Sequence, residues 1–433
     1  MTGNSLLTCE TTQAKVYRLE LRKHFTNKSL ESYLATFEKH LAVLNDKINL
    51  IVDSKDKGVI KDIKPTLSTL VLDTIGENLF STRFSSQKAG RKEPQFITDI
   101  DCCLTEADWL LIEQWKTTSG NFVIMSLAAW LGPMCWKLLA LAGRVISFKM
   151  AMIRLVLKIY WKVFWQRRKL GDHYQPPSTM MGAVVDRQMS AFYSSNLSLL
   201  TFYSGFRDAF WHLSIFMLAG HQTSTMTLTW ALYYLCRHET VRQKLQEEVD
   251  DFLKNREENS PQEMTEVLTD KSALKYLEAV LKETMRLAPA GPYLGRKATA
   301  DVTLPVNFAE DSGEPTEFMT IPAGTNVIVM SQYMHYSERY FRKAGSFIPE
   351  RWLKATENEF ENIPPPCYNP FSAGTRACIG EKYAMLQMKL ALLSLCSKFD
   401  FTFAHPDTTF CTPLHHMVQG PARFAVKFSH RIK

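Results

Sequence analysis

The sequence predicts a mainly α-helical protein with small β sheets that folds as one domain over residues 1–433. Charged residues recur at helical spacing through most of the chain, as in residues 240–253. β signals are few and late, and no Gly/Ser-rich linker or internal repeat divides the chain. Apolar residues make up 45% of the sequence and aromatic residues 12%, which is enough for one large core.

An apolar segment, residues 122–143, carries one charge, at Lys137. Its hydropathy makes it a marginal transmembrane candidate, although Gly132-Pro133 is expected to break the run. A buried helix pair is the alternative interpretation. In either case the segment leads directly into a basic one.

Residues 141–170 contain eight basic residues and no acid. Arg154, Lys158 and Lys162 are four apart and share one face of the predicted helix, whereas Leu155 and Ile159 occupy another. A basic amphipathic helix of this kind favours a membrane surface or an acidic partner. A solvated helix face is the alternative.

Residues 202–236 predict a long helix that is buried on most sides, because Arg207 and Asp208 are its only charges. Gly220, in its middle, is unfavourable in a helix by about 1 kcal/mol relative to Ala, and close approach of a ligand would explain it. Thr223 lies on the same face, although a threonine there can simply bond back to its own helix.

A shorter helix is predicted over residues 276–289, where Pro289 ends the apolar periodicity. Glu283 and Arg286 are three apart and share a face of it. Strands are predicted at residues 301–305, 320–330 and 423–428, with an exposed acidic loop over 306–318.

Residues 371–380 read Phe-Ser-Ala-Gly-Thr-Arg-Ala-Cys-Ile-Gly. Gly374 and Gly380 allow turns and the close approach of a flat ligand. Arg376 can pair with a carboxylate and favours the thiolate form of the nearby Cys378, while Phe371 is suited to pack near the sulfur. A buried structural cysteine in a glycine-rich turn is the alternative.

This segment resembles the haem-binding loop of the cytochrome P450 family, Phe-x-x-Gly-x-Arg-x-Cys-x-Gly. Two further motifs are similar to that family: Glu283-x-x-Arg286, and Ala219-Gly220-x-x-Thr223. The resemblance implies a cytochrome P450 fold that binds haem b, iron protoporphyrin IX, through the Cys378 thiolate. It also implies a structural ionic triad of Glu283, Arg286 and Arg351, the last within Phe-Ile-Pro-Glu-Arg-Trp.

The same resemblance assigns roles in oxygen chemistry to the 219–223 motif. Thr223 and Gly220 would serve dioxygen activation. Gln222 stands where the family usually has an acid, and a glutamine cannot donate a proton as an acid does.

Carboxylates of the haem would be held by Arg376, Arg296 and Arg22. Residues 15–47 look like the family's third major helix, which usually carries Trp-x-x-x-Arg. Arg22 matches the arginine of that motif, but Arg18 occupies the tryptophan position.

The predicted function is a membrane-associated haem-thiolate monooxygenase, which inserts one oxygen atom from dioxygen into an apolar small molecule: a lipid, a sterol or a xenobiotic. No phosphate loop or Gly-x-Gly-x-x-Gly is present, so electrons would come from a separate flavoprotein reductase. The chain has no nucleic-acid motif, and its nine irregularly spaced cysteines argue against a disulfide framework. The expected location is the cytosolic face of the endoplasmic reticulum membrane, or another intracellular membrane.

Two alternatives remain open at this stage. The non-acidic Gln222 favours a thiolate-haem isomerase or dehydratase that needs no external electrons. The first ten residues show neither a membrane anchor nor the N-terminal β lobe of the family, which favours an inactive, truncated haem protein. The resemblance covers roughly residue 15 to the end, and resemblance also suggests that residues 122–143 form mobile helices over a substrate pocket.

Overall fold

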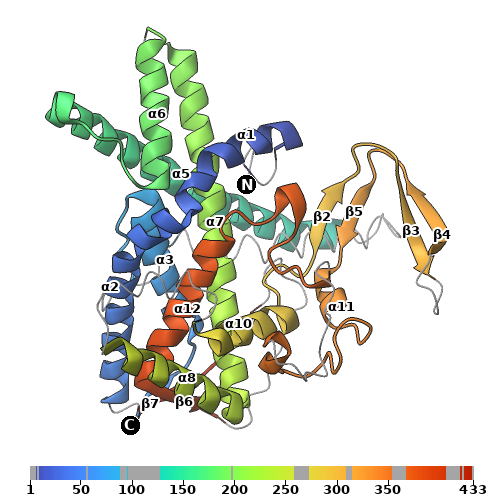
Figure 1. Cartoon of the computed structure of the whole chain (residues 1–433). Coiled ribbons are helices and arrows are strands. Elements are labelled where there is room, and N and C mark those ends of the chain that lie inside the picture. The colour runs from blue at the N-terminus through green and yellow to red at the C-terminus, as the bar shows by residue number, and fades with distance from the viewer. Residues whose placement is uncertain are drawn as a thin grey trace.

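A computed structural model describes residues 6, 9–54, 57–87, 95, 127–196, 198–257, 273–308, 315–353, 367–405, 420–421 and 424–431. Within α5, side chains are described from residue 143 onward. Helices dominate these ranges, and Figure 1 shows them packed around the long helix α7. The predicted mainly α fold with small sheets is confirmed.

The helices lie in this order along the chain: α1 (Thr11–Leu21), η1 (Arg22–Phe25), α2 (Asn27–Val52), α3 (Lys64–Phe80), α5 (Leu127–Leu170), η2 (Gly171–His173), α6 (Met180–Ser194), α7 (Leu199–Arg237), α8 (Glu239–Glu257), α10 (Lys275–Leu287), α11 (Ser331–His335), η3 (Pro349–Trp352), η5 (Gly374–Arg376) and α12 (Glu381–Lys398). The three predicted helices in the second half therefore match α7, α8 and α10 within a few residues.

Among the described residues, small antiparallel sheets complete the fold. One has the order β1 (Val59–Ile60), β7 (Val426–His430) and β6 (Phe399–Phe403), and the others pair β2 (Leu294–Lys297) with β5 (Asn326–Val329) and β3 (Val302–Phe308) with β4 (Pro315–Ile321). In the first sheet Phe401 lies opposite Phe428, and both are buried. This sheet joins a strand near the start of the chain to two near its end.

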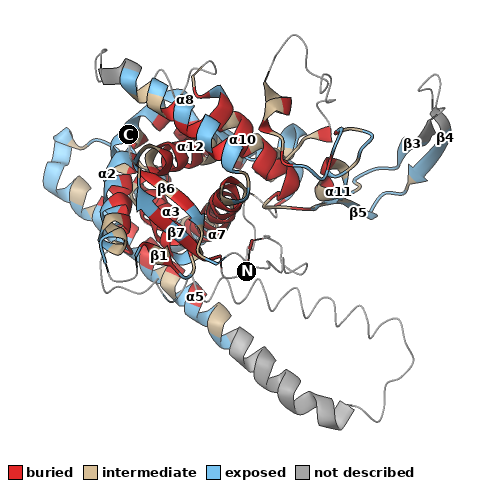
Figure 2. Ribbon diagram, turned by 90° about the horizontal axis from the view of Figure 1, so that it is seen from below, coloured by how far each residue is buried: buried red, intermediate tan, exposed pale blue. Residues whose placement is uncertain are grey.

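The core lies where α3, α7, α10 and α12 meet, and Figure 2 shows their buried faces turned toward one another. α3 is buried along nearly its whole length, and α7 is buried from Ala209 to Leu235 with few interruptions. Phe25 of η1 links two of these helices, because its ring stacks on Phe216 of α7 at 5.9 Å and meets Tyr383 of α12 edge-on at 6.4 Å.

Three local predictions are wrong. Residues 15–47 form two helices instead of one, because Thr26 caps α2 by accepting the Ser29 N–H at 3.4 Å. Gly132-Pro133 does not interrupt the helix, since α5 runs through both residues. Residues 306–318 are not all loop: β3 extends to Phe308 and β4 begins at Pro315.

The apolar segment 122–143 lies mostly outside the described side chains. Across the helices that the structure describes, none has the length and hydropathy needed to cross a membrane. α5 itself is amphipathic as predicted. Its inner face buries Val156, Ile159 and Val163, whereas Arg154, Lys158 and Lys162 are exposed.

Candidate haem-thiolate site

The Cys378 loop connects residues 368–372 to the first turn of α12. The Cys378 N–H donates to the Phe371 carbonyl at 2.8 Å, which closes the loop. Gly374 has a φ of +72°, a conformation that favours glycine, whereas Gly380 is the N-cap of α12 with a φ of −92°. The sequence pattern therefore folds into a tight loop that presents its sulfur at the start of a helix.

The Cys378 thiol is exposed. Desolvation by the surrounding protein and the charge of Glu381 raise its pKa, while the backbone N–H groups of Gly380 and Glu381 and the charge of Arg18 act in the opposite direction. N–H groups at a helix N-terminus stabilise a thiolate. The Cys378 sulfur is exposed and lies at the N-terminus of a helix. Such a sulfur can serve as a thiolate ligand to a metal ion.

Arginines surround this loop, but two of them bind protein backbone. Arg376 donates to the carbonyls of Leu6 and Cys9 at 3.1 and 2.6 Å, and Arg18 donates to the Ala377 carbonyl at 2.7 Å. Arg18 was not among the predicted site residues. The sequence feature that could have identified it is its place in the motif, where it stands at the family's tryptophan position.

The other two arginines predicted to bind haem, Arg296 and Arg22, differ in their contacts. Arg296, exposed on β2, donates to the Ser372 hydroxyl at 2.9 Å and therefore lies against the loop. Arg22 is exposed in η1. Phe371 is half-buried and packs against the main core.

The middle of α7 opens on one side. Ala219 is exposed and Thr223, one turn later, is half-buried, although the neighbouring turns are buried. The Thr223 hydroxyl donates to the Ala219 carbonyl at 2.6 Å, so the threonine bonds back to its own helix.

The structure gives a packing reason for Gly220, beside the predicted approach of a ligand. A Cβ at this position would lie 3.2 Å from Ile75 Cδ1, so the glycine lets α7 pack on α3. Gln222 is 6% exposed and lies inside the protein. The open face of the motif thus belongs to Ala219 and Thr223.

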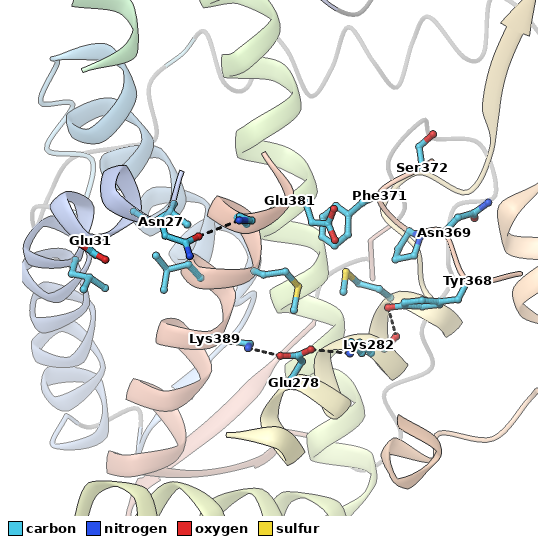
Figure 3. A pocket seen from close by; sticks show the side chains of 17 residues that line it. Asn27, Glu31, Glu278, Lys282, Tyr368, Asn369, Phe371, Ser372, Glu381 and Lys389 are labelled. Carbon is cyan, nitrogen blue, oxygen red and sulfur yellow. Dashed lines mark hydrogen bonds and ion pairs between the residues drawn. The ribbon is translucent and has the colours of Figure 1, made fainter. Parts of the chain in front are cut away.

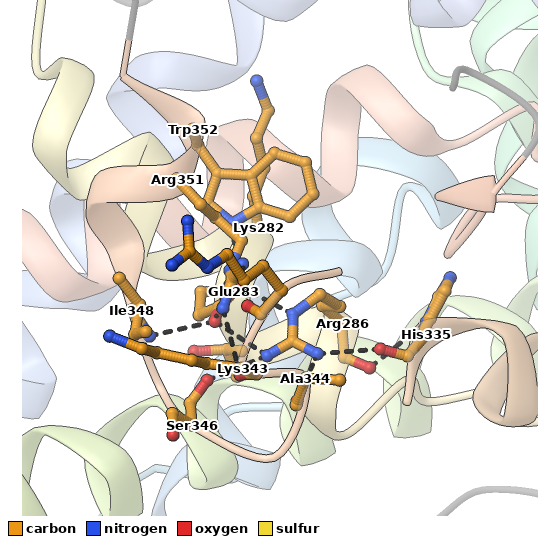
Figure 4. A network of polar contacts seen from close by, with 12 residues as sticks. Lys282, Glu283, Arg286, His335, Lys343, Ala344, Ser346, Ile348, Arg351 and Trp352 are labelled. Atoms are coloured by element: carbon orange, nitrogen blue, oxygen red, sulfur yellow. Dashed lines mark hydrogen bonds and ion pairs between the residues drawn. The ribbon is translucent and has the colours of Figure 1, made fainter. Parts of the chain in front are cut away.

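Figure 4 shows the Glu283 network, defined by Glu283, Arg286, Arg351 and Trp352. Arg286 forms a bidentate pair with Glu283 at 2.8 and 2.9 Å, and Arg351 Nε donates to the same carboxylate at 3.0 Å. The Trp352 indole and the Ile348 N–H fill the remaining positions of the carboxylate at 3.0 and 2.9 Å. The geometry of the predicted triad is therefore present, with Trp352 as an additional member.

His335 connects this network to the loop. Its Nδ1 lies 3.2 Å from the Arg286 carbonyl, and its Nε2 accepts the Asn369 N–H at 3.3 Å. Such partners fix the neutral ring with the proton on Nδ1. Burial lowers the pKa of His335 to about 4.

A cleft of about 400 Å³ opens beside the loop, between α2, α10 and α12 (Figure 3). Glu278 lies in its wall between Lys282 and Lys389, at 2.8 and 2.6 Å, and Lys382 donates to Asn27 at 3.1 Å. Residues 368–372 form another wall. Cys378, Thr223 and Arg296 do not line this cleft.

Comparison with known proteins identifies a family for this chain. The cytochrome P450 family model matches residues 210–428. Cytochrome P450 3A7 of Homo sapiens is 36% identical over 187 residues, or 43% of this chain and 33% of that protein. Cytochrome P450 4d2 of Drosophila melanogaster is 36% identical over 202 residues, or 47% and 35% respectively. The matched region thus spans about a third of the length of these relatives.

A solved structure, that of the cytochrome P450DA haem domain, superposes with a TM-score of 0.71 at 19% identity. The superposition covers 100% of this chain and 80% of that one. At this level of identity the likeness concerns the fold.

Proposed function

Because the chain belongs to the cytochrome P450 family, whose cofactor is haem b, we propose that it is a monooxygenase with Cys378 as the ligand to haem iron. It would insert one oxygen atom from dioxygen into an apolar small molecule. The observation that carries the proposal is the open Cys378 sulfur, polarised by the N-terminus of α12. Bound haem would supply the oxygen chemistry, which a thiolate ligand favours.

The chain's own residues would hold and orient the cofactor. Arg296 lies against the loop and would bind a propionate. Arg376 and Arg18 would instead fix the loop through backbone carbonyls. Arg376 would have to give up its bonds to the Leu6 and Cys9 carbonyls to bind a propionate. Arg22, exposed in η1, is the other arginine for which the family resemblance implies this role.

The open face of α7 would border the reaction site. Thr223 already donates its proton to Ala219, so its oxygen would accept a hydrogen bond from water or from a ligand. Gln222 would orient a neighbouring group without supplying a proton. Electrons would come from a flavoprotein reductase that docks over the cleft. Three lysines of the cleft, Lys282, Lys382 and Lys389, lie beside the segment that leads to Cys378.

The exposed cations of α5 support peripheral contact with an anionic membrane. Trp161 and Trp165 are 65% and 46% exposed among these cations, and tryptophan favours the interface between lipid and water. The cytosolic face of the endoplasmic reticulum is the location we propose.

One observation favours a second candidate, an electron-independent isomerase or dehydratase. Neither Gln222 nor Thr223 offers an acidic proton at the open turn of α7. The two functions differ in one measurable respect, since only the monooxygenase needs a reductant for turnover.

The ligand assignment is tested by spectroscopy. The reduced, carbon-monoxide-bound protein should show the red-shifted Soret band of sulfur ligation, and Cys378→Ala should abolish it. Cys367→Ala is the matched control, because Cys367 is a buried free cysteine in a satellite core cluster. A normal band in Cys378→Ala would refute the assignment, and failure of the unmodified chain to retain haem would favour an inactive haem protein.

A further inference from the structure

The α6–α7 hairpin projects from the body of the protein, as Figure 1 shows at the top of the view. α6 ends at Ser194, Asn196 has a φ of +52°, and α7 begins at Leu199. We call the exposed side chains of this turn, Tyr193, Leu199, Leu200 and Tyr203, the hairpin tip.

The hairpin tip is apolar and uncharged. Leu199 and Leu200 are 80% and 81% exposed, and Tyr203 and Tyr193 are 65% and 45% exposed. Residues 188–206 contain no Asp, Glu, Lys, Arg or His. Adjacent exposed leucines at the end of a projecting hairpin are unusual for a surface that meets only water.

The inner side of the hairpin holds the tip in place. Phe202 packs against Phe192 at 5.5 Å and against Tyr160 of α5 at 5.7 Å. The Tyr160 hydroxyl donates to Gln188 at 2.8 Å. A Cβ on Gly205 would lie 3.2 Å from Gln188, so the two helices approach closely. The tip is therefore a braced projection of the fold.

Three serine hydroxyls near the tip are bonded to backbone carbonyls three or four residues earlier. The hydroxyls of Ser194, Ser195 and Ser204 donate to the carbonyls of Ser190, Phe192 and Thr201 at 2.8, 2.9 and 3.0 Å. Hydroxyls bonded in this way lose little when water is removed, whereas unbonded ones would be costly to bury. The tip thus suits a medium that offers few hydrogen bonds.

We propose that the hairpin tip inserts into the interfacial layer of a lipid bilayer, with Leu199 and Leu200 among the acyl chains. Tyr193 and Tyr203 would lie at the level of the headgroups, where aromatic residues with one polar end are favoured. The proposal deepens the membrane contact of the proposed function and rests on it. Lipid is favoured over a protein partner because four side chains on a convex tip offer less area than the roughly 800 Å² per partner of a stable interface.

The tip and α5 make opposite predictions about salt and lipid charge. An uncharged tip binds zwitterionic vesicles, and salt leaves that binding unchanged. The α5 cations bind anionic vesicles, and salt weakens that binding. The two contributions are therefore separable in one chain.

The test is co-sedimentation of the haem-loaded chain with phosphatidylcholine vesicles at low and high salt. Leu199→Ser/Leu200→Ser should lower the partition coefficient about tenfold, because two buried leucines are lost. Leu199→Trp/Leu200→Trp should preserve binding. Leu19→Ser/Leu50→Ser is the matched control, since these leucines are 62% and 72% exposed on α1 and α2.

The outcomes separate this proposal from the function. Unchanged partitioning of the serine variant, or no binding of the unmodified chain to phosphatidylcholine, would overturn the tip proposal. If Arg154→Glu/Lys158→Glu/Lys162→Glu still abolished salt-sensitive binding to anionic vesicles, membrane association through α5 would stand. If the unmodified chain formed dimers without lipid and the serine variant did not, the tip would be a self-association surface instead. The Soret band tests the haem assignment independently of all these results.

Discussion

The Glu283 network and the Cys378 loop are joined through His335, yet they satisfy their polar groups in opposite ways. In the network, protein donors surround a carboxylate that is 0% exposed. At the loop, the sulfur and the Arg296 side chain remain exposed. The network is thus complete without a ligand, whereas the loop presents surface that a ligand can cover.

The Glu283 network positions the Cys378 loop. Arg286 binds the carbonyls of His335, Ala344 and Ser346, and His335 in turn holds Asn369, two residues before Phe371. Rigid support behind a ligand site reduces the cost of ordering it on binding. Removing the support should therefore affect both regions, whereas removing the sulfur should affect one.

The largest expected effect comes from Arg351→Leu, which leaves Glu283 buried with one cation fewer. Breaking a buried ion pair costs about 3–5 kcal/mol, so the variant should lose haem and aggregate. Denaturant unfolding and haem content measure this.

Lys39→Leu is the control for that variant, because Lys39 pairs with Glu77 while 48% exposed. An exposed pair contributes about 0–1 kcal/mol, so this substitution should be nearly neutral. A soluble, haem-replete Arg351→Leu protein that is merely slower would show that the network does not support the loop.

The next effect is a dependence of stability on pH that comes from His335. Its folded pKa is about 4 and its ordinary value is 6.5, so the unfolded chain binds the extra proton between these values. Stability is therefore full above pH 6.5 and falls as the pH drops toward 4, by on the order of 3 kcal/mol. Burial also lowers the pKa of His24 and His212 to about 4, which adds to the same window.

His335→Gln should reduce the slope of unfolding free energy against pH between 6.5 and 4, although it lowers stability above pH 6.5. His173→Gln, at an exposed position, is the control. If His335→Gln kept the full slope, His335 would not be held neutral between the two regions.

Much of the Glu283 network could be predicted from the sequence, and less of the Cys378 loop. Glu283 and Arg286 share a helix face through their spacing, and the resemblance to a known family supplied Arg351. Trp352 and His335 had no signal of their own, because carboxylate and carbonyl contacts between distant segments leave no periodicity. At the loop, the spacing of Gly374, Cys378 and Gly380 was informative about the backbone.

The sequence did not indicate which protein groups Arg376 and Gly220 meet. Arg376 reaches the carbonyls of Leu6 and Cys9, and Gly220 serves helix packing against Ile75. Both residues occupy the expected positions in their motifs. Which neighbour a long or absent side chain meets depends on tertiary packing, and motif spacing does not encode that packing.

The smallest expected effect concerns the supply of protons at the exposed turn of α7. Burial raises the pKa of a carboxyl group, so Gln222→Glu would place a protonated acid next to Thr223. We expect the product formed per reductant consumed to rise roughly fivefold, about 1 kcal/mol in the partition between product and released peroxide. Thr223→Ala should lower the same ratio, because the hydroxyl on the open face is lost.

Thr227→Ala is the matched control for Thr223→Ala, because Thr227 makes the same bond one turn later, to the Thr223 carbonyl at 3.0 Å, and is buried. Removing either hydroxyl leaves one helix carbonyl without that donor, but only Thr223 lies on the open face. A ratio that responds to Thr223 and Gln222 but not to Thr227 would identify this face as the route for protons. If none of the three variants changed the ratio, protons would reach the site elsewhere, and turnover without reductant would then decide for the isomerase.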